Sequence, residues 1–181
     1  MGLLRFDTPH ELFLSLPQIA ELTQQRPRPD EDSLAFLGRL RSSTTPEEAI
    51  TYTAFAALPQ MAVRWGYECL RLMAEHLDPM ERPMMEMIAA WLDHPSTAMR
   101  QRIAREALWA PSRSPSVQLG LAVAWSGGPV APNDPMPAPI HRAPRSVNSA
   151  VLSCVARADM RARSVFLARF IDMAESFFRV Y

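Results

Sequence analysis

Few side chains in this 181-residue sequence are suited to bind a metal ion or to act as nucleophiles. It contains four histidines, His10, His76, His94 and His141. No two of them are four residues apart, the spacing that places two zinc ligands on one helical face. Cys69 and Cys154 are too few for a zinc-ligand set or a disulfide framework, so we expect both thiols to be buried among apolar side chains. We predict no metal site, and a site shared by His76 and Cys69, which lie on one helical face, is kept as the alternative.

The groups that acid–base or covalent catalysis would need also stand in unsuitable contexts. Carboxylates cluster at residues 30–32 and 47–48, but both clusters stand at expected helix starts, where negative charge offsets the helix dipole. Ser126 lacks the Gly-x-Ser-x-Gly context of a hydrolase nucleophile. The chain has no lysine, which excludes a Schiff base and a phosphate-loop lysine. We therefore predict a non-enzymatic protein with no catalytic residue and no cofactor. A small-molecule or metal-dependent enzyme built between helices is the alternative.

The formal charges balance overall but divide unevenly along the chain. Residues 1–95 hold 14 acidic side chains against 8 arginines, and residues 96–181 hold 5 against 11. The division predicts that the two halves attract each other within one fold, and steering of a charged protein partner is the other interpretation. A net charge of zero makes general nucleic-acid binding unexpected. A local nucleic-acid interface remains an alternative, formed by the arginines of the last helices, Arg157, Arg161, Arg163 and Arg169.

The secondary-structure elements that carry these residues are expected to be helices, because apolar residues recur at spacings of three and four and strand-like alternation is nearly absent. Thr45, Pro46 and Glu48 form the pattern of a capping box, Asp78 and Pro79 repeat it, and a cap is expected at residue 96 or 97. The predicted helices are residues 8–25 with a break at position 17, 31–42, 46–58, 60–77, 82–93, 96–109, 115–126, and 146–180 with a break near position 159.

The predicted fold class is therefore all-α, a compact bundle of about eight short helices in a single domain over residues 1–181. Antiparallel pairs stacked irregularly, as in a solenoid, are the alternative arrangement, but no fixed repeat is present. Methionines cluster at positions 80, 84, 85 and 87, and we expect them to be adaptable core residues. A groove for a partner helix is the other interpretation of that cluster.

One stretch, WSGGPVAPNDPMPAPIHRAPR at residues 125–145, interrupts the helical pattern. We expect Gly127 to adopt the left-handed conformation just past a helix end. The prolines at 129, 132, 135, 137, 139 and 144 oppose a helix and favour an extended chain. We predict a proline-rich strap over residues 129–144 that crosses the domain and is held by Trp125, Met136 and Ile140. Recognition of the prolines by an SH3-type module, or of a basic rim by an acidic partner, are the alternatives.

Two segments flank this strap, AVAWSGG at residues 122–128 and RSVNSAVLSCVA at residues 145–156. Together with the strap they resemble an uncharacterised bacterial family of small all-helical proteins. The resemblance is carried by residues 122–156, with WSGG as its specific part. It implies no activity and no catalytic residue. It also implies an association with gene loci of contractile, type VI-like secretion systems.

We accordingly predict an accessory, adaptor or chaperone-like protein that binds another protein. The chain lacks a run of about 18 apolar residues, and its first residues lack a secretory pattern, so we expect a cytoplasmic protein without membrane contact. The residues expected to contact the partner are Trp125, Met136, Ile140, His141, Arg142 and Arg145.

Overall fold

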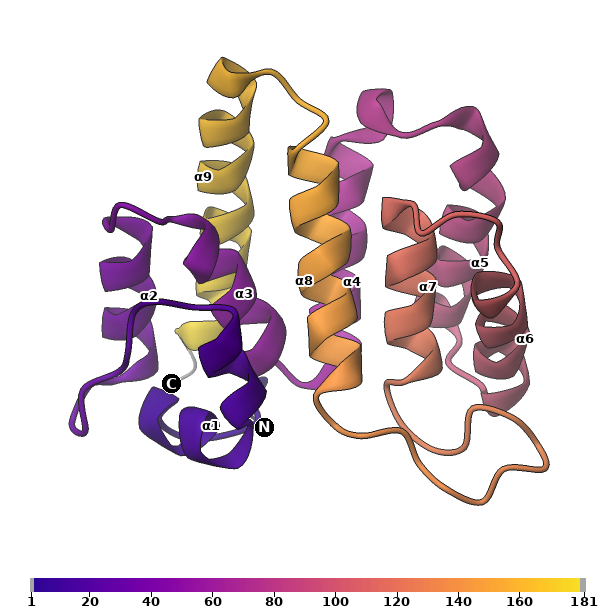
Figure 1. Ribbon diagram of the computed structural model, residues 1–181, viewed down its shortest axis with the longest axis horizontal. Coiled ribbons are helices and arrows are strands. Elements are labelled where there is room, and N and C mark those ends of the chain that lie inside the picture. The colour runs from indigo at the N-terminus through magenta and orange to yellow at the C-terminus, as the bar shows by residue number, and fades with distance from the viewer. Residues whose placement is uncertain (1, 180–181) are drawn as a thin grey trace.

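A computed structural model describes residues 2–179, and within them the chain forms nine α-helices, three 3-10 turns and no β-strand (Figure 1). The α-helices are α1 (Pro9–Ser15), α2 (Ser33–Arg41), α3 (Glu47–Ala56), α4 (Pro59–Leu72), α5 (Arg82–Asp93), α6 (Thr97–Leu108), α7 (Pro115–Ala124), α8 (Arg142–Val155) and α9 (Met160–Phe178). The 3-10 turns are η1 (Pro17–Glu21), η2 (Ala74–His76) and η3 (Pro79–Glu81). The prediction of an all-α fold is confirmed.

Helix α8 lies at the centre of the bundle. It packs against α7 on one side, α3 on the other and α4 behind it, as Figure 1 shows. Helices α5 and α6 complete the side next to α7, and α2 and α9 complete the side next to α3. Because α8 packs between its immediate predecessor α7 and the much earlier helices α3 and α4, the elements do not stack in chain order as in a solenoid. The compact bundle is therefore the arrangement that forms.

Most predicted helices occur within a few residues of their expected bounds, and three differ. The helix expected over 8–25 is α1 followed by η1, and residues 22–25 are not helical. Helix α4 ends at Leu72, five residues early, and η2 follows. Helix α8 begins at Arg142, four residues before the expected start at 146. The expected end of the last helix at residue 180 lies outside the described residues.

Two of the three predicted caps form. The hydroxyl of Ser96 accepts the Met99 N–H at the start of α6, and Asp78 and Glu81 form a capping box at η3. The box expected from Thr45 and Glu48 is wrong. The Glu48 carboxylate instead accepts the backbone N–H groups of Gln24 (2.5 Å) and Gln25 (2.9 Å), in a chain segment remote in sequence. The carboxylate thus provides acceptors for two N–H groups that would otherwise lack a partner in a non-helical segment.

The core has an aromatic centre and a tightly packed helix pair. Phe36 and Tyr52 lie edge to face with ring centroids 4.8 Å apart, and both are fully buried. Helix α7 is buried on almost every side. A Cβ atom on Gly120 would lie 2.8 Å from the Met84 sulfur and 3.3 Å from the Ala107 Cβ. The missing side chain at this position therefore lets α7 approach α5 and α6 closely.

Ion pairs join the two oppositely charged halves of the chain. Arg145 pairs with Glu21 (2.9 Å) and Arg157 with Glu81 (2.7 Å). Arg41 bridges the halves in the opposite sense, since it belongs to the acidic half and pairs with two carboxylates of α9. These contacts agree with the interpretation that the halves attract each other. No helix in residues 2–179 has the length and apolarity that crossing a bilayer requires.

Candidate functional site

The proline-rich segment does not cross the domain. Helices α7 and α8 are antiparallel neighbours, and residues 125–141 form a loop that leaves their lower end in Figure 1 and returns to it. An isolated bridge pairs Pro129 with Pro137 within the loop. Met136 and Ile140, expected to hold the strap, are 69% and 60% exposed. The predicted strap over 129–144 is therefore wrong in its path and in two of its three anchors, whereas Trp125 is partly buried against the core.

Two local details of this loop also differ from the prediction. The left-handed residue is Gly128, with φ of 73°, rather than Gly127. Pro144 lies inside α8, at its third position. A proline is tolerated there because the first N–H groups of a helix have no intrahelical acceptor.

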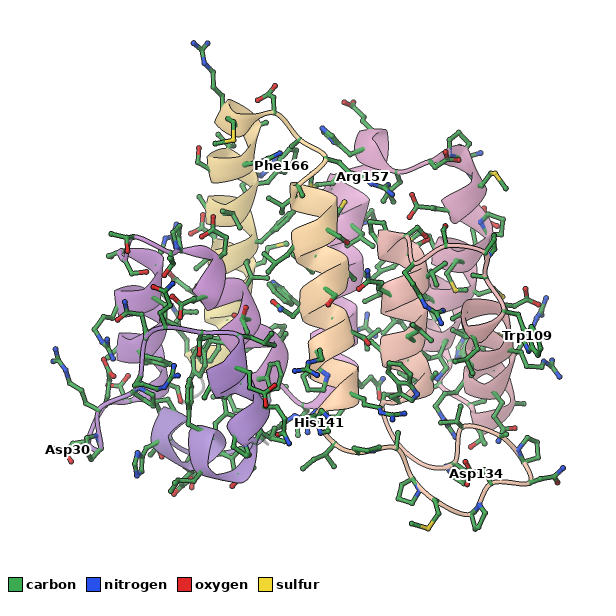
Figure 2. All side chains as sticks on the ribbon, in the orientation of Figure 1. Asp30, Trp109, Asp134, His141, Arg157 and Phe166 are labelled. Atoms are coloured by element: carbon green, nitrogen blue, oxygen red, sulfur yellow. The ribbon has the colours of Figure 1, made fainter. Side chains whose placement is uncertain are left out.

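The six residues predicted to contact a partner are not gathered at one place. The guanidinium of Arg142 stacks over the Trp125 ring at 5.5 Å from its centroid. Arg145 points to Glu21 on η1 instead, and His141 is the residue before α8, at the base of the loop in Figure 2. Met136 and Ile140 project from the loop. Of the six side chains, those of Trp125 and Arg142 are thus in contact, whereas that of Arg145 is engaged with Glu21.

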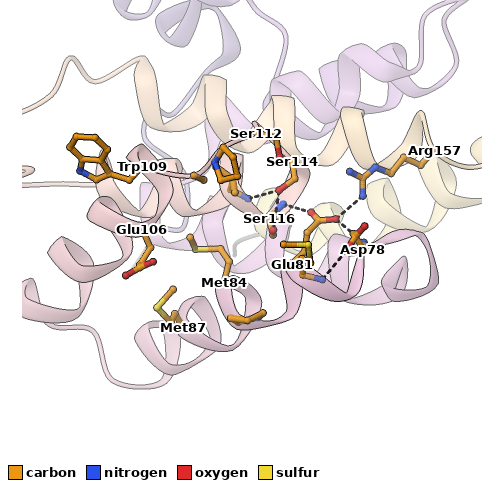
Figure 3. Close-up of a pocket in the computed structure, with 15 residues that line it drawn as sticks. Asp78, Glu81, Met84, Met87, Glu106, Trp109, Ser112, Ser114, Ser116 and Arg157 are labelled. Atoms are coloured by element: carbon orange, nitrogen blue, oxygen red, sulfur yellow. Dashed lines mark hydrogen bonds and ion pairs between the residues drawn. The ribbon is translucent and has the colours of Figure 1, made fainter.

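An apolar surface lies at the opposite end of α7, at the methionine cluster whose alternative interpretation was a groove for a partner helix. A groove of about 520 Å³ runs between η3, the first turns of α5, the C-terminal end of α6 and the segment leading into α7. Met84 and Met87 of α5 and Val117 of α7 line it, and Arg157 closes one end (Figure 3). The methionine cluster is therefore partly core and partly groove wall.

Trp109 and Met80 stand at the rim of this groove and are the most exposed large apolar side chains described. Trp109 is 86% exposed and Met80 is 85% exposed. Figure 2 shows Trp109 at the edge of the molecule, beside the end of α6. A signal for it exists in the sequence: Ile103 and Ala107 mark the buried face of α6, and Trp109 falls outside that register. A tryptophan left in solvent is uncommon, because exposing the large apolar surface of its indole ring to water costs more free energy than exposing most other side chains.

The polar centre of the groove is the buried carboxylate of Glu81. One oxygen accepts the Ser116 N–H at the start of α7 (3.1 Å). The other accepts the Asp78 N–H (2.8 Å) and a guanidinium N–H of Arg157 (2.7 Å), as Figure 3 shows. Burial alone would raise the pKa of Glu81, but these hydrogen bonds, led by that of Arg157, outweigh it and hold the pKa below its ordinary value. The carboxylate joins η3, α7 and the segment after α8, and it accepts three hydrogen bonds from within the fold.

The arginines considered for a nucleic-acid interface do not form one free basic face. Arg157 is paired with Glu81, and Arg163 donates to the carbonyls of Ala156 (2.7 Å) and Ala158 (2.9 Å) at the end of α8. Arg163 thus caps a helix from the next helix. Arg161 and Arg169 remain exposed on α9.

The residues considered for a metal site also lie in structural settings. Cys69 and Cys154 are fully buried free thiols, as predicted, and burial raises the pKa of both. His76 is in η2, with its ring at 5.7 Å from that of Phe166 and in an edge-on arrangement. Among residues 2–179 no three histidine, cysteine, aspartate or glutamate side chains are close enough together to hold a metal ion.

A family model described as "Family of unknown function (DUF6931)" matches residues 36–178. The chain belongs to this family. The match runs from within α2 to the end of α9, so the groove, the buried Glu81 and the proline-rich loop all lie within the family region. The comparisons with curated proteins and with solved structures give no match. The expected membership of an uncharacterised family of small proteins is thereby confirmed.

Proposed function

We propose that this protein is a non-enzymatic accessory or adaptor protein that binds a partner protein through the groove between η3, α5, α6 and α7. The observation that carries the proposal is the exposure of Trp109 and Met80 at the two rims of one apolar groove. Tryptophan and methionine are enriched in the cores of protein interfaces, and tryptophan is prominent among residues that dominate binding energy. The remaining wall, from Met84 and Met87, is adaptable in shape.

The charges around the groove indicate the partner's chemistry. Glu106 lines the groove on the α6 side and is exposed, and no ion pair engages it among the described residues. Asp78 lies on the η3 side. We therefore assign to the partner an amphipathic helical segment whose apolar face enters the groove and whose basic residue reaches Glu106. Helices bind grooves in this way, with anchors at spacings of three and four residues.

The internal bonding of Glu81 favours binding over proton transfer at this groove. A general base needs a free lone pair within reach of its substrate. Both Glu81 oxygens accept hydrogen bonds from the protein, and the lowered pKa keeps the carboxylate charged rather than poised to exchange a proton. Glu81 instead fixes the positions of η3 and α7, which form two walls of the groove, relative to each other.

Site-specific photocrosslinking in the host cell tests the proposal. A photoreactive residue replaces Met80, Ile140 or, as a control on the exposed face of α6, Arg102. Mass spectrometry identifies the crosslinked peptide. We expect the Met80 position to yield one helical, apolar and basic segment that the Arg102 position does not yield. Crosslinking from Ile140 with none from Met80 would assign the binding surface to the proline-rich loop and overturn the groove.

The recovered segment, made as a synthetic peptide, then provides a quantitative test. Trp109→Ser should weaken its binding about tenfold or more, because truncated interface tryptophans commonly cost at least about 2 kcal/mol. The variant should unfold at the same temperature as the parent chain, since the indole is 86% exposed and leaves no cavity. Unchanged affinity for the peptide would refute the role of Trp109.

The cellular setting forms a separate part of the proposal. We infer from the resemblance of residues 122–156 that the protein is bacterial, works in the cytoplasm and serves a contractile secretion system. Identification of the crosslinked segment as part of such an apparatus would support this inference. A partner from an unrelated process would refute it without affecting the groove.

A further inference from the structure

A second surface feature lies at the opposite end of α6 from Trp109 and centres on Arg100. This side chain belongs to the first turns of α6 and is 5% exposed. No carboxylate among residues 2–179 pairs with it. One guanidinium N–H donates to the carbonyl of Ala124 at the end of α7 (3.1 Å). A buried cation that lacks a counter-ion is costly, so this position calls for an anion.

The guanidinium opens into a shallow pocket of about 290 Å³. Its lining residues come from the start of α6, Pro95, Ser96 and Thr97, from the turn after α7, Ser126 and Gly127, and from Gln60 and Trp91. None of these side chains is acidic. The WSGG motif, the most specific part of the sequence pattern, thus supplies one wall of the pocket.

Backbone N–H groups without a backbone acceptor belong to two segments that border this pocket, the start of α6 and the turn after α7. Thr97 and Ala98 are in the first turn of α6, where a helix offers no internal acceptor, and only the Met99 N–H is capped, by Ser96. The N–H groups of Gly127 and Gly128 have no backbone acceptor among the described residues. The positive end of the α6 dipole adds to the local field.

Gly128 fits this arrangement for a steric reason. Its φ of 73° is a conformation that other residues adopt with strain, and a Cβ atom here would lie 3.2 Å from a terminal nitrogen of Arg100. The turn therefore lets the backbone pass close to the guanidinium. Two glycines in succession keep the N–H groups on this side free of side-chain cover.

We propose that this pocket binds a phosphate group, held by Arg100, by the first-turn N–H groups of α6 and by the N–H groups of Gly127 and Gly128. The donors come from two segments: α6, which supplies the Arg100 guanidinium and its own first-turn N–H groups, and the glycine turn after α7. Such a set suits the several oxygens of a tetrahedral anion better than the two coplanar oxygens of a carboxylate. The proposal is independent of the protein-binding groove, because no lining residue is shared.

Titration of the ¹⁵N-labelled protein at constant ionic strength and neutral pH tests the site directly by NMR. The probes are inorganic phosphate, glycerol phosphate and acetate. We expect saturable shifts of the Thr97, Ala98, Gly127 and Gly128 amide signals with phosphate, at millimolar concentrations. Tighter binding of glycerol phosphate would identify a phosphoryl group on a larger molecule as the ligand, and tighter binding of inorganic phosphate would identify the free ion.

Three variants separate the site from general effects. Arg100→Gln should weaken phosphate binding at least about tenfold, since the charge-assisted bonds are lost. Thr97→Glu places a carboxylate at the first position of α6, where it favours the helix dipole. It should keep the thermal stability and abolish the phosphate response, so it decides the question even if Arg100→Gln unfolds. Arg102→Gln, at an exposed position on the same helix, should bind phosphate as the parent does.

Three results would overturn the proposal. The first is the lack of any saturable shift at these amides in the parent chain. The second is a phosphate response that persists in Thr97→Glu. The third is acetate binding as tightly as phosphate, which would contradict the match to a tetrahedral anion.

Discussion

Replacing Glu81 by glutamine perturbs the junction of η3, α7 and α8 with almost no change in shape. Glutamine retains one oxygen and presents an NH₂ group in place of the other. In the parent chain the two oxygens accept three hydrogen bonds, from Ser116, Asp78 and Arg157. The NH₂ group therefore faces at least one N–H donor, so that two donors oppose each other without an acceptor. Arg157 also loses the negatively charged carboxylate with which it forms an ion pair.

The size of the effect follows from burial and bonding. Hydrogen bonds to a charged group contribute about 1.5–3 kcal/mol each, and breaking a buried ion pair by removing one partner costs about 3–5 kcal/mol. The Glu81 side chain is 5% exposed, but that of Arg157 is 36% exposed, so water screens part of their attraction. We therefore expect a loss of about 3 kcal/mol in the free energy of unfolding at neutral pH. For a chain of this length, that loss lowers the unfolding midpoint by about 6–12 °C.

Urea unfolding followed by circular dichroism, at pH 7 and at a series of acid pH values, measures this difference. The pKa of Glu81 is lower in the folded protein than its ordinary value of 4.5 in an unfolded chain. The stabilisation from the ionised form is thus complete above the unfolded pKa and is lost as the pH falls through the folded pKa. The gap between parent and Glu81→Gln should therefore narrow as the pH decreases below about 4.5.

Glu86→Gln is the matched control, because Glu86 is exposed on the neighbouring helix and forms no ion pair among the described residues. Its unfolding free energy should stay within about 0.5 kcal/mol of the parent's. The reasoning is refuted by a Glu81→Gln effect below about 1 kcal/mol at pH 7. It is equally refuted by an effect that does not depend on pH, since a purely steric cause would give that result.

Other substitutions and reagents test separate features of the fold. Gly120→Val should destabilise the chain by about 1–3 kcal/mol in urea unfolding. The reason is that a Cβ atom at position 120 would lie only 2.8 Å from the Met84 sulfur, so the added side chain would not fit without displacing its neighbours. Gly128→Ala should cost about 1 kcal/mol for its positive φ, whereas Gly127→Ala, whose Cβ meets nothing within 4 Å, should cost almost none; equal costs would contradict the backbone argument. Both cysteines should resist Ellman's reagent at pH 8 in the folded state and react after unfolding, because both are buried and the pKa of Cys154 is raised to about 11. Fast reaction of the native protein would show that the core opens there.

The helices were predictable because their determinants are local. Periodic apolar residues, first-turn prolines and caps such as Ser96 act within a few residues and fix α5, α6 and α7 closely. The errors in the predicted caps and helix bounds arise where a contact with a residue distant in sequence determines the local structure. The carboxylate of Glu48 bonds to Gln24 and Gln25 rather than capping its own helix, and no sequence pattern announces that contact.

The loop between α7 and α8 shows the same division. Its prolines correctly predicted an irregular segment, but its path depends on α7 and α8 being neighbours, which is a tertiary property. The methionine cluster suggested a partner groove only as an alternative, because Trp109, Met80 and the wall residues come from separate elements that only the fold assembles. In the sequence Arg100 looks like an ordinary helix residue. Its burial and its lack of a carboxylate partner depend on which side chains surround it in the folded protein.

The insertion of α8 between α3 and α7 constrains how the chain acquires its structure. The apolar faces that α3 and α4 turn toward α8 have no cover until residues 142–155 are available. During synthesis those faces emerge from the ribosome well before their partner, so the first half of the chain cannot complete a stable domain alone. Folding must wait for contacts between residues far apart in sequence. These contacts slow folding and lengthen the time for which partly folded chains expose apolar surface. Newly made chains should for this reason depend on chaperones more than a simple up-and-down helical bundle of equal size.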